Sequence, residues 1–250
     1  MSKFHKMPVI VGLFGVLVCA IILELSVDFG WVMQIIVPRP SDAIMSFPVV
    51  QEDMDLFGNF FVTLGMTAAA TLIALLIGLP FGYFLYRREA YGIAYEGWLA
   101  ALFSTPIVLL YPLFLVLFGR NYHTLVIMGC IPGAVAIAIQ TRQGLLGVSK
   151  TLLNVGRSFN ISERDMFRKI MLPSATPTIF TGIRLGVMYT LVNIVAIEYL
   201  IDFGGLGRIV SQMYDRFDIP ETYASILAVI LVSSIFYAGF GRIEKWLRPE

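Results

Sequence analysis

Long apolar runs without charge are the feature that most constrains the fold of this chain. No charged residue occurs between Asp55 and Arg87, and only 14% of all residues are charged, whereas an average soluble domain has roughly 25%. The runs show neither the alternation of half-buried strands nor the single apolar stripe of surface helices. Because backbone that faces lipid must satisfy its own hydrogen bonds, we predict an all-α integral membrane protein.

Six segments are long enough, or nearly so, to cross a hydrocarbon core of ~30 Å with about 20 apolar residues each. They run approximately over 8–23, 57–86, 98–118, 124–141, 178–201 and 223–241. The first is the shortest, and Lys3 and Lys6 precede it as they would precede a secretory signal. No small-x-small cleavage site follows it, so we interpret it as a retained anchor.

Lysine and arginine are distributed unevenly among the segments that join these spans. If the N-terminus is cytoplasmic, thirteen basic residues face inward and four face outward, with Arg184 inside a span. The inner set is Lys3, Lys6, Arg87, Arg88, Arg142, Lys150, Arg157, Arg164, Arg168, Lys169, Arg242, Lys245 and Arg248, and the outer set is Arg39, Arg120, Arg208 and Arg216. Since basic residues favour the cytoplasmic side, we predict that both termini are cytoplasmic.

Three joining segments are longer than simple connectors. Residues 24–56 and 202–222 face outward and are acidic, and residues 142–177 face the cytoplasm. We divide the chain into an anchor helix with its outer loop, residues 1–56, and a membrane core, residues 57–250, which contains the cytoplasmic loop 142–178. The net charge of +1 gives no reason to expect a nucleic-acid partner.

The cytoplasmic loop has the spacing of short amphipathic helices. Ser162-Glu-Arg-Asp165 resembles a capping box and predicts a helix start, and Pro173 and Pro177 are expected to stop or bend the chain. Two interpretations are open on periodicity alone. The loop either lies on the inner leaflet, held by its basic residues, or docks against another protein.

The spacing of the loop resembles the signature of permease subunits of type I ATP-binding-cassette importers. That signature is Glu-Ala-Ala, three variable residues, a glycine, nine variable residues and Ile-x-Leu-Pro. Asn154-Val-Gly156, Asn160 and Ile170-Met-Leu-Pro173 match it without gaps. Asn154 replaces the glutamate and Asn160 the glycine, although asparagine tolerates the left-handed turn that the glycine would make.

The resemblance extends over about residues 57–245, towards the nitrate, taurine and sulfonate branch of these permeases. It is carried by Leu172-Pro-Ser-Ala-Thr-Pro177, Thr181-Gly-Ile-Arg-Leu185, Glu198 and Gly204-Gly-Leu-Gly207. It implies the type I importer (MetI-like) permease fold, a bacterial cytoplasmic (inner) membrane, two ATPase subunits, a second permease subunit, identical or different, and an external solute-binding protein. The solute would be small, polar and anionic.

The resemblance also implies that a short coupling helix, about 158–167, sits in a groove of the ATPase. The expected ATPase-coupling residues are Ser158, Phe159, Asn160, Ile161, Ser162, Glu163, Arg164, Asp165, Met166, Phe167 and Pro173. The sequence has no Gly-x-x-x-x-Gly-Lys-Ser/Thr phosphate loop, so nucleotide chemistry would belong to another chain.

Few polar side chains lie within the spans, and these are the candidates for a translocation pathway. We select Asn193, Thr105, Tyr111 and Glu198, with interhelical packing as the alternative role for each. Glu198 and Arg184 lie near span ends, where bracing of a neighbouring helix is favoured over contact with solute. Thr105-Pro106 and Tyr111-Pro112 are expected to kink the third span.

We expect no catalytic residue, cofactor or metal site. Cys19 and Cys130 fall in apolar runs and are interpreted as small core residues, and His5 and His123 are isolated. A membrane enzyme would need a cluster of reactive groups at one depth, and an ion-driven secondary transporter would show coupling carboxylates or inverted repeats. We keep the secondary transporter as the alternative to an ATP-driven permease.

Overall fold

The computed structural model describes residues 7–247, and all regular structure within that range is helical. The elements in chain order are α1 (Met7–Asp28), α2 (Pro40–Met45), α3 (Phe47–Met54), α4 (Leu56–Arg87), α5 (Glu89–Ser104), a 3₁₀ turn (Ile107–Leu110), α6 (Tyr111–Phe118), α7 (Tyr122–Leu146), α8 (Lys150–Ser158), α9 (Glu163–Asp165), a π-helical segment (Met166–Met171), α10 (Leu172–Ile201), α11 (Gly205–Asp215) and α12 (Ile219–Leu247). The predicted fold class is confirmed.

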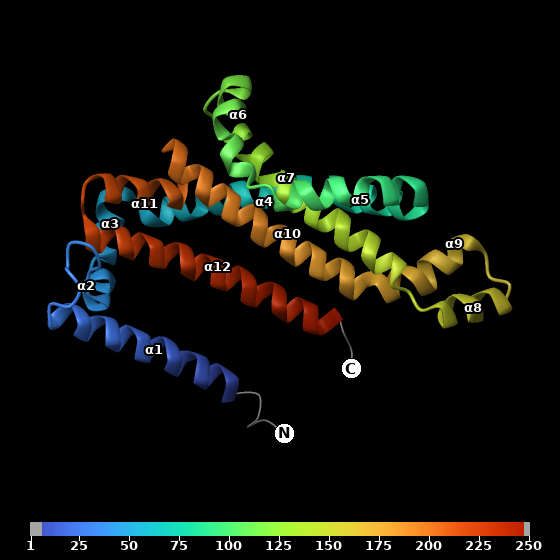
Figure 1. The fold of residues 1–250 in the computed structure, drawn as a ribbon, viewed down its shortest axis with the longest axis horizontal. Coiled ribbons are helices and arrows are strands. Elements are labelled where there is room, and N and C mark those ends of the chain that lie inside the picture. The colour runs from blue at the N-terminus through green and yellow to red at the C-terminus, as the bar shows by residue number, and fades with distance from the viewer. Residues whose placement is uncertain (1–6, 248–250) are drawn as a thin grey trace.

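Within residues 7–247, five helices are long and apolar enough to cross a membrane, or six spans if the bent pair α5 and α6 counts as one. The third predicted span, 98–118, is wrong as a single helix, because α5 begins at Glu89 and the chain bends by 80° before α6. Pro106 follows the end of α5, and Thr105 before it takes an extended backbone with φ −76° and ψ 127°, as residues before proline prefer. The predicted kink is therefore present, and it is a full break (Figure 1).

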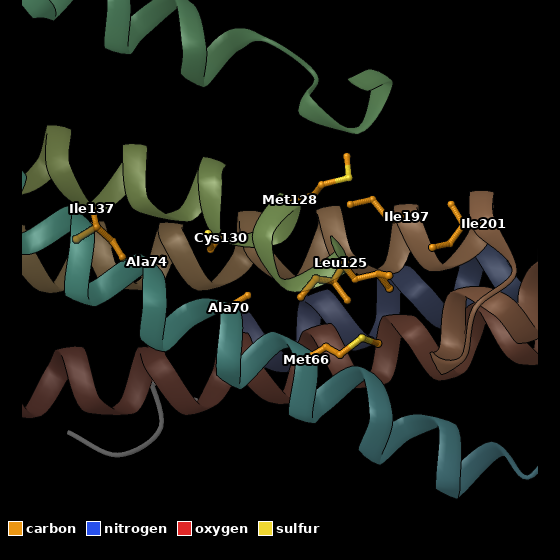
Figure 2. Packing of buried hydrophobic residues seen from close by; sticks show 10 residues of the cluster. Met66, Ala70, Ala74, Leu125, Met128, Cys130, Ile137, Ile197 and Ile201 are labelled. Atoms are coloured by element: carbon orange, nitrogen blue, oxygen red, sulfur yellow. The ribbon is translucent and has the colours of Figure 1, made fainter. Parts of the chain in front are cut away.

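The centre of the fold is the packing of α4, α7 and α10. Its buried side chains come from all three helices (Figure 2) and are Met66, Ala70, Ala74, Leu125, Met128, Cys130, Ile137, Ile194, Ile197 and Ile201. Cys130 is a core residue as predicted, whereas Cys19 is exposed on α1. The prediction for Cys19 is wrong because α1 lies apart from the bundle (Figure 1).

Two glycines one helical turn apart let α4 approach α7 closely. A Cβ atom added at Gly78 would lie 2.7 Å from the carbonyl oxygen of Ala134, and one at Gly82 would lie 2.5 Å from that of Ala138. Small residues at this spacing allow membrane helices to pack backbone to backbone, where van der Waals contact drives association. The short distance between α4 and α7 is thus possible because Gly78 and Gly82 carry no side chain.

A second core lies at the end of the bundle where α3, the start of α4 and α11 meet α12, and it includes Val50, Leu206, Ile209, Met213 and Ala224. The long segments predicted to face outward are thus folded into short helices. The start of α1 and the end of α12 point toward the end of the molecule that carries α8 and α9 (Figure 1). Lys3, Lys6, His5 and Arg248 lie outside the described residues.

Candidate functional site

The loop between α7 and α10 is a short helical hairpin, and its turn falls at Asn160. This residue has φ +54°. Its N–H donates to the carbonyl of Arg157 at 2.9 Å, and the N–H of Ile161 donates to that of Gly156 at 3.4 Å. These two bonds form the Schellman end of α8, in which the residue after the cap is left-handed. The predicted left-handed turn is confirmed.

The predicted coupling helix at 158–167 is wrong in its position. A residue with positive φ cannot lie inside a right-handed helix, so Asn160 ends α8 and separates it from α9. The free-standing short helix is α8, residues Lys150–Ser158, which carries the Asn154-Val-Gly156 triplet of the motif. Residues 158–167 contain the last residue of α8, the turn and the start of the next helix.

Ser162 begins that next helix, as the capping pattern predicted. Its hydroxyl oxygen accepts the backbone N–H of Asp165 at 3.2 Å and donates to the Asp165 carboxylate at 3.0 Å. The acidic side chain therefore bonds the serine hydroxyl, whereas a complete capping box would bond the serine N–H. The start of the helix is confirmed, with one of its two expected contacts replaced.

Pro173 and Pro177 do not stop this helix. The chain continues from Glu163 to Ile201 through the π-helical segment, with Pro173 in the first turn of α10 and Pro177 inside it. A π turn is wider than an α turn and makes room for the Pro173 ring, which would otherwise clash with the carbonyl four residues earlier. Around Pro173 the helix therefore changes its winding locally but continues without a break.

The inner face of the hairpin is packed against the bundle. A Cβ atom added at Gly156 would lie 2.7 Å from Cε of Met166 and 2.8 Å from Cδ1 of Ile170, so α8 and the π segment touch at this glycine. The Phe167 ring lies 5.0 Å from that of Tyr83 at the end of α4. Phe167, which we predicted to contact the ATPase, is partly buried and packs the hairpin against α4.

The outer face of α8 is apolar and exposed. Leu152, Val155 and Phe159 are 45%, 48% and 77% exposed, and their spacing of three and four residues places them on one helical face. Of the predicted set, Ser158, Phe159, Asn160, Ser162, Glu163, Arg164 and Pro173 are exposed, and Ile161, Asp165, Met166 and Phe167 are partly buried. Leu152 and Val155 lie outside the predicted set, although their helical spacing with Phe159 is visible in the sequence.

At the opposite end of the bundle, Glu198 is fully buried in a hydrogen-bond cluster. Its carboxyl group accepts the Thr63 hydroxyl at 2.8 and 2.9 Å and the N–H of Gly207 at 3.0 Å. The N–H of Leu206 donates to the Thr63 hydroxyl at 2.9 Å. These amides belong to the first turn of α11, whose N–H groups have no partner within their own helix.

Glycine at Gly205 and Gly207 is what lets this cluster close. Gly205 has φ +81°, and its N–H donates to the Asn59 side-chain oxygen at 2.8 Å. A Cβ atom at Gly207 would lie 2.2 Å from the carbonyl oxygen of Val195 on α10. Glu198 therefore joins α4, α10 and α11, and it is not open to solvent among the described residues.

The other pathway candidates do not converge on one cavity. Thr105 is exposed and its hydroxyl donates to the carbonyl of Ala101, while the Asn193 amide donates to that of Tyr189. Tyr111 packs partly buried on the central core. Arg184 lies with its guanidinium 4.0 Å from the centre of the Tyr237 ring of α12, the kind of helix-bracing contact expected for it.

Residues 74–250 match the family model described as the inner membrane component of binding-protein-dependent transport systems. The chain belongs to this family. It is therefore a membrane-spanning permease component of an ATP-binding-cassette importer, and its location is the inner membrane.

Individual relatives and one solved structure agree with this assignment. The glycine betaine/proline betaine permease of Escherichia coli is 32% identical over 183 residues, which are 70% of this chain and 49% of that protein. The bicarbonate permease of Synechocystis is 22% identical over 249 residues, which cover 95% of this chain and 88% of that protein. The inward-facing methionine importer MetNI superposes with a TM-score of 0.68 at 19% identity, covering 78% of this chain and 96% of that one.

Proposed function

We propose that this chain couples a separate ATPase to solute movement through the exposed face of α8, formed by Leu152, Val155 and Phe159. The observation that carries the proposal is that this apolar face projects from the bundle while the opposite face of the hairpin is already packed. An apolar helix face of this kind needs a groove in a partner. Exposed Ser158, Glu163 and Arg164 would form its polar rim.

The continuous helix behind the hairpin supplies the stiffness that coupling requires. Residues 163–201 are 39 residues in length, and at 1.5 Å per residue they span roughly 58 Å. Displacement at α8 passes through Met166 and Ile170 into this helix, and at the far end Glu198 ties the same helix to α11. A push on the loop would therefore move the opposite end of the bundle.

The assembly that follows has two ATPase subunits, a second permease chain and an external binding protein, with ATP hydrolysed only by the ATPases. Both termini and α8 would face the cytoplasm. We further propose that residues 1–56 act as an anchor with an outer loop and 57–250 as the core. Whether the second permease is identical is decided by mass spectrometry of the purified complex.

The proposed solute is small and polar and carries an anionic group. The relatives named for glycine betaine and for bicarbonate share that chemistry, since glycine betaine has a carboxylate. Asn193, Thr105 and Tyr111 are proposed to lie on the pathway, where each would offer a neutral hydrogen-bonding group. Glu198 is proposed to brace the outer end, because its carboxyl group is already enclosed.

The test is to purify the chain with its partners from mild detergent and to measure ATP-driven uptake of labelled bicarbonate and glycine betaine in vesicles, with choline as the solute lacking an anionic group. Phe159→Ala should reduce both the recovered ATPase and uptake about tenfold or more, because burying a phenylalanine contributes roughly 1.5–3 kcal/mol. Phe57→Ala, at a side chain 66% exposed at the start of α4, is the matched control and should change neither. Recovery without any ATPase, or uptake indifferent to ATP, would refute the proposal.

A further inference from the structure

An arginine and a glutamate face each other across α5 and α7, at the end of the bundle that carries α8. The guanidinium of Arg142 lies 3.2 Å from the carboxylate of Glu96. The Arg142 side chain is only 13% exposed, whereas that of Glu96 is 64% exposed. The arginine side chain is thus held within the bundle, whereas the exposed glutamate side chain has room to turn away from it.

The buried guanidinium has spare hydrogen-bonding capacity. Nε of Arg142 is buried and has no hydrogen-bond partner among the described residues. Guanidinium groups carry five N–H donors in a planar fork, and buried ones normally use them. Nη1 bonds Glu96, so Nε is the buried donor left without an acceptor among the described residues, which is costly in a site of low dielectric constant unless a ligand or water supplies one.

A small cavity lies beside this pair. It has a volume of about 110 Å³ and is lined by Gly92, Glu96, Leu99, Ala100, Ile139, Arg142 and Gln143. A water molecule takes up about 30 Å³ in the liquid, so the cavity holds a few waters or one small oxyanion. Glycine at position 92 lets the backbone of α5 lie close to both groups, because a Cβ atom there would lie 2.5 Å from the carbonyl oxygen of Leu85 and 2.7 Å from Nε of Arg142.

Helix α5 borders a second cavity as well as this one. A second, apolar cavity of about 240 Å³ lies further along the same helix and shares Leu99 with the first. The end of α5 is fixed by the Phe103 ring, 4.7 Å from the Tyr189 ring on α10, and the chain breaks directly after it. Among the described residues, the Arg142–Glu96 pair is the ion pair that joins α5 to α7.

We infer that Arg142 is a binding site for the anionic group of the transported solute, and that Glu96 occupies this site as a displaceable competitor when solute is absent. Gln143 supplies a second polar group to the cavity. The inference rests on the proposed transport of an anionic solute. The charge, the planar fork and the size of the cavity select small oxyanions such as carboxylate, sulfonate, nitrate or bicarbonate.

The test measures thermal unfolding of the full chain in phosphatidylcholine nanodiscs. Sodium nitrate or sodium methanesulfonate replaces sodium gluconate at constant ionic strength, since gluconate is too large for the cavity. The small anions should raise the unfolding midpoint of the wild type. For Glu96→Gln, the same rise in the unfolding midpoint should need about two- to fivefold less anion, the factor expected from removing an exposed ion-pair competitor. For Arg142→Gln, the small anions should no longer raise the midpoint.

The matched control is Arg87→Gln, at an exposed arginine whose partner Glu163 lies 3.8 Å away at the same end of the bundle; it should keep the wild-type response. If Arg142→Gln does not fold, the wild type still decides, because an ion pair that is only structural gives no stabilisation by the small anions relative to gluconate while Glu96 is in place. An unchanged or weakened response in Glu96→Gln overturns the inference. So does a shift produced equally by phosphatidylglycerol, which would make the ligand a lipid. ATP-driven uptake measured in parallel separates the two proposals, since uptake would remain if this site alone is wrong.

Discussion

The buried cluster around Glu198 predicts a large difference between two threonines one helical turn apart on α4. Thr63 donates to Glu198 at 2.8 Å and accepts the N–H of Leu206 at 2.9 Å. Thr67 is 1% exposed, but its hydroxyl has no hydrogen-bond partner among the described residues. Valine has nearly the shape of threonine, so either substitution to valine removes a hydroxyl without opening a cavity.

The magnitude follows from what each substitution leaves unpaired. Thr63→Val leaves a buried N–H without an acceptor and a buried carboxyl group with one donor fewer, and each buried group left unsatisfied costs about 1–3 kcal/mol. Glu198 keeps the Gly207 N–H, so we expect a loss of about 2–4 kcal/mol in the free energy of unfolding. Thr67→Val removes an unpaired polar group from an apolar environment and should be neutral or stabilising.

The assay is equilibrium unfolding by sodium dodecyl sulfate titration in mixed micelles, with Thr63→Ser as the variant that keeps the hydroxyl. Thr63→Ser should recover most of the stability lost in Thr63→Val. If Thr63→Val and Thr67→Val have the same free energy of unfolding, then the hydrogen bonds to Glu198 and Leu206 contribute nothing. In that case the argument that Glu198 fastens α11 to the bundle would be wrong.

Two further substitutions test the close helix contact and the loop turn. Gly82→Ala should destabilise the chain by about 1–3 kcal/mol in the same assay, because the added methyl group meets the Ala138 carbonyl oxygen at 2.5 Å, whereas Gly65→Ala, which meets nothing within 4 Å, should not. Asn160→Ala should cost about 1–2 kcal/mol because its φ is +54° and should lower ATPase recovery, while Asn160→Gly should preserve both. Equal recovery of ATPase with alanine and glycine would show that the turn geometry is not needed for coupling.

Features set by local chemistry could be predicted from the sequence. The capping serine Ser162, the left-handed Asn160 and the break at Pro106 each follow from the preferences of one or two residues, and each is present. The fold class followed from the apolar runs in the same way. What could not be predicted is which side of a helix is packed, because Phe167 reaches Tyr83, 84 residues away in the chain.

The error in the loop helix has a cause in the residues themselves. The glycine position of the motif, filled by Asn160, already marks a left-handed turn, and such a turn must separate two helices. The motif therefore contained a helix before Asn160 and another after it. The helix predicted at about 158–167 spans this turn, although the capping serine Ser162 already marks the start of the second helix. The left-handed turn at Asn160, taken together with the helical spacing of Leu152, Val155 and Phe159, locates α8.

The charged side chains within the bundle bear on where solute selectivity can arise. Glu198 is enclosed by α4 and α11, Arg184 lies on the Tyr237 ring, and Arg142 faces Glu96. Apart from Glu198, the buried side chains of α4, α7 and α10 carry no charge, and the buried polar ones are threonines such as Thr67 and Thr190. A buried charge persists only with a partner, and a solute anion would have no cationic partner in that centre. Recognition of the solute anion by this chain is therefore expected at α5 rather than within the three-helix core. Cavities border α5, and one partner of its ion pair, Glu96, is exposed.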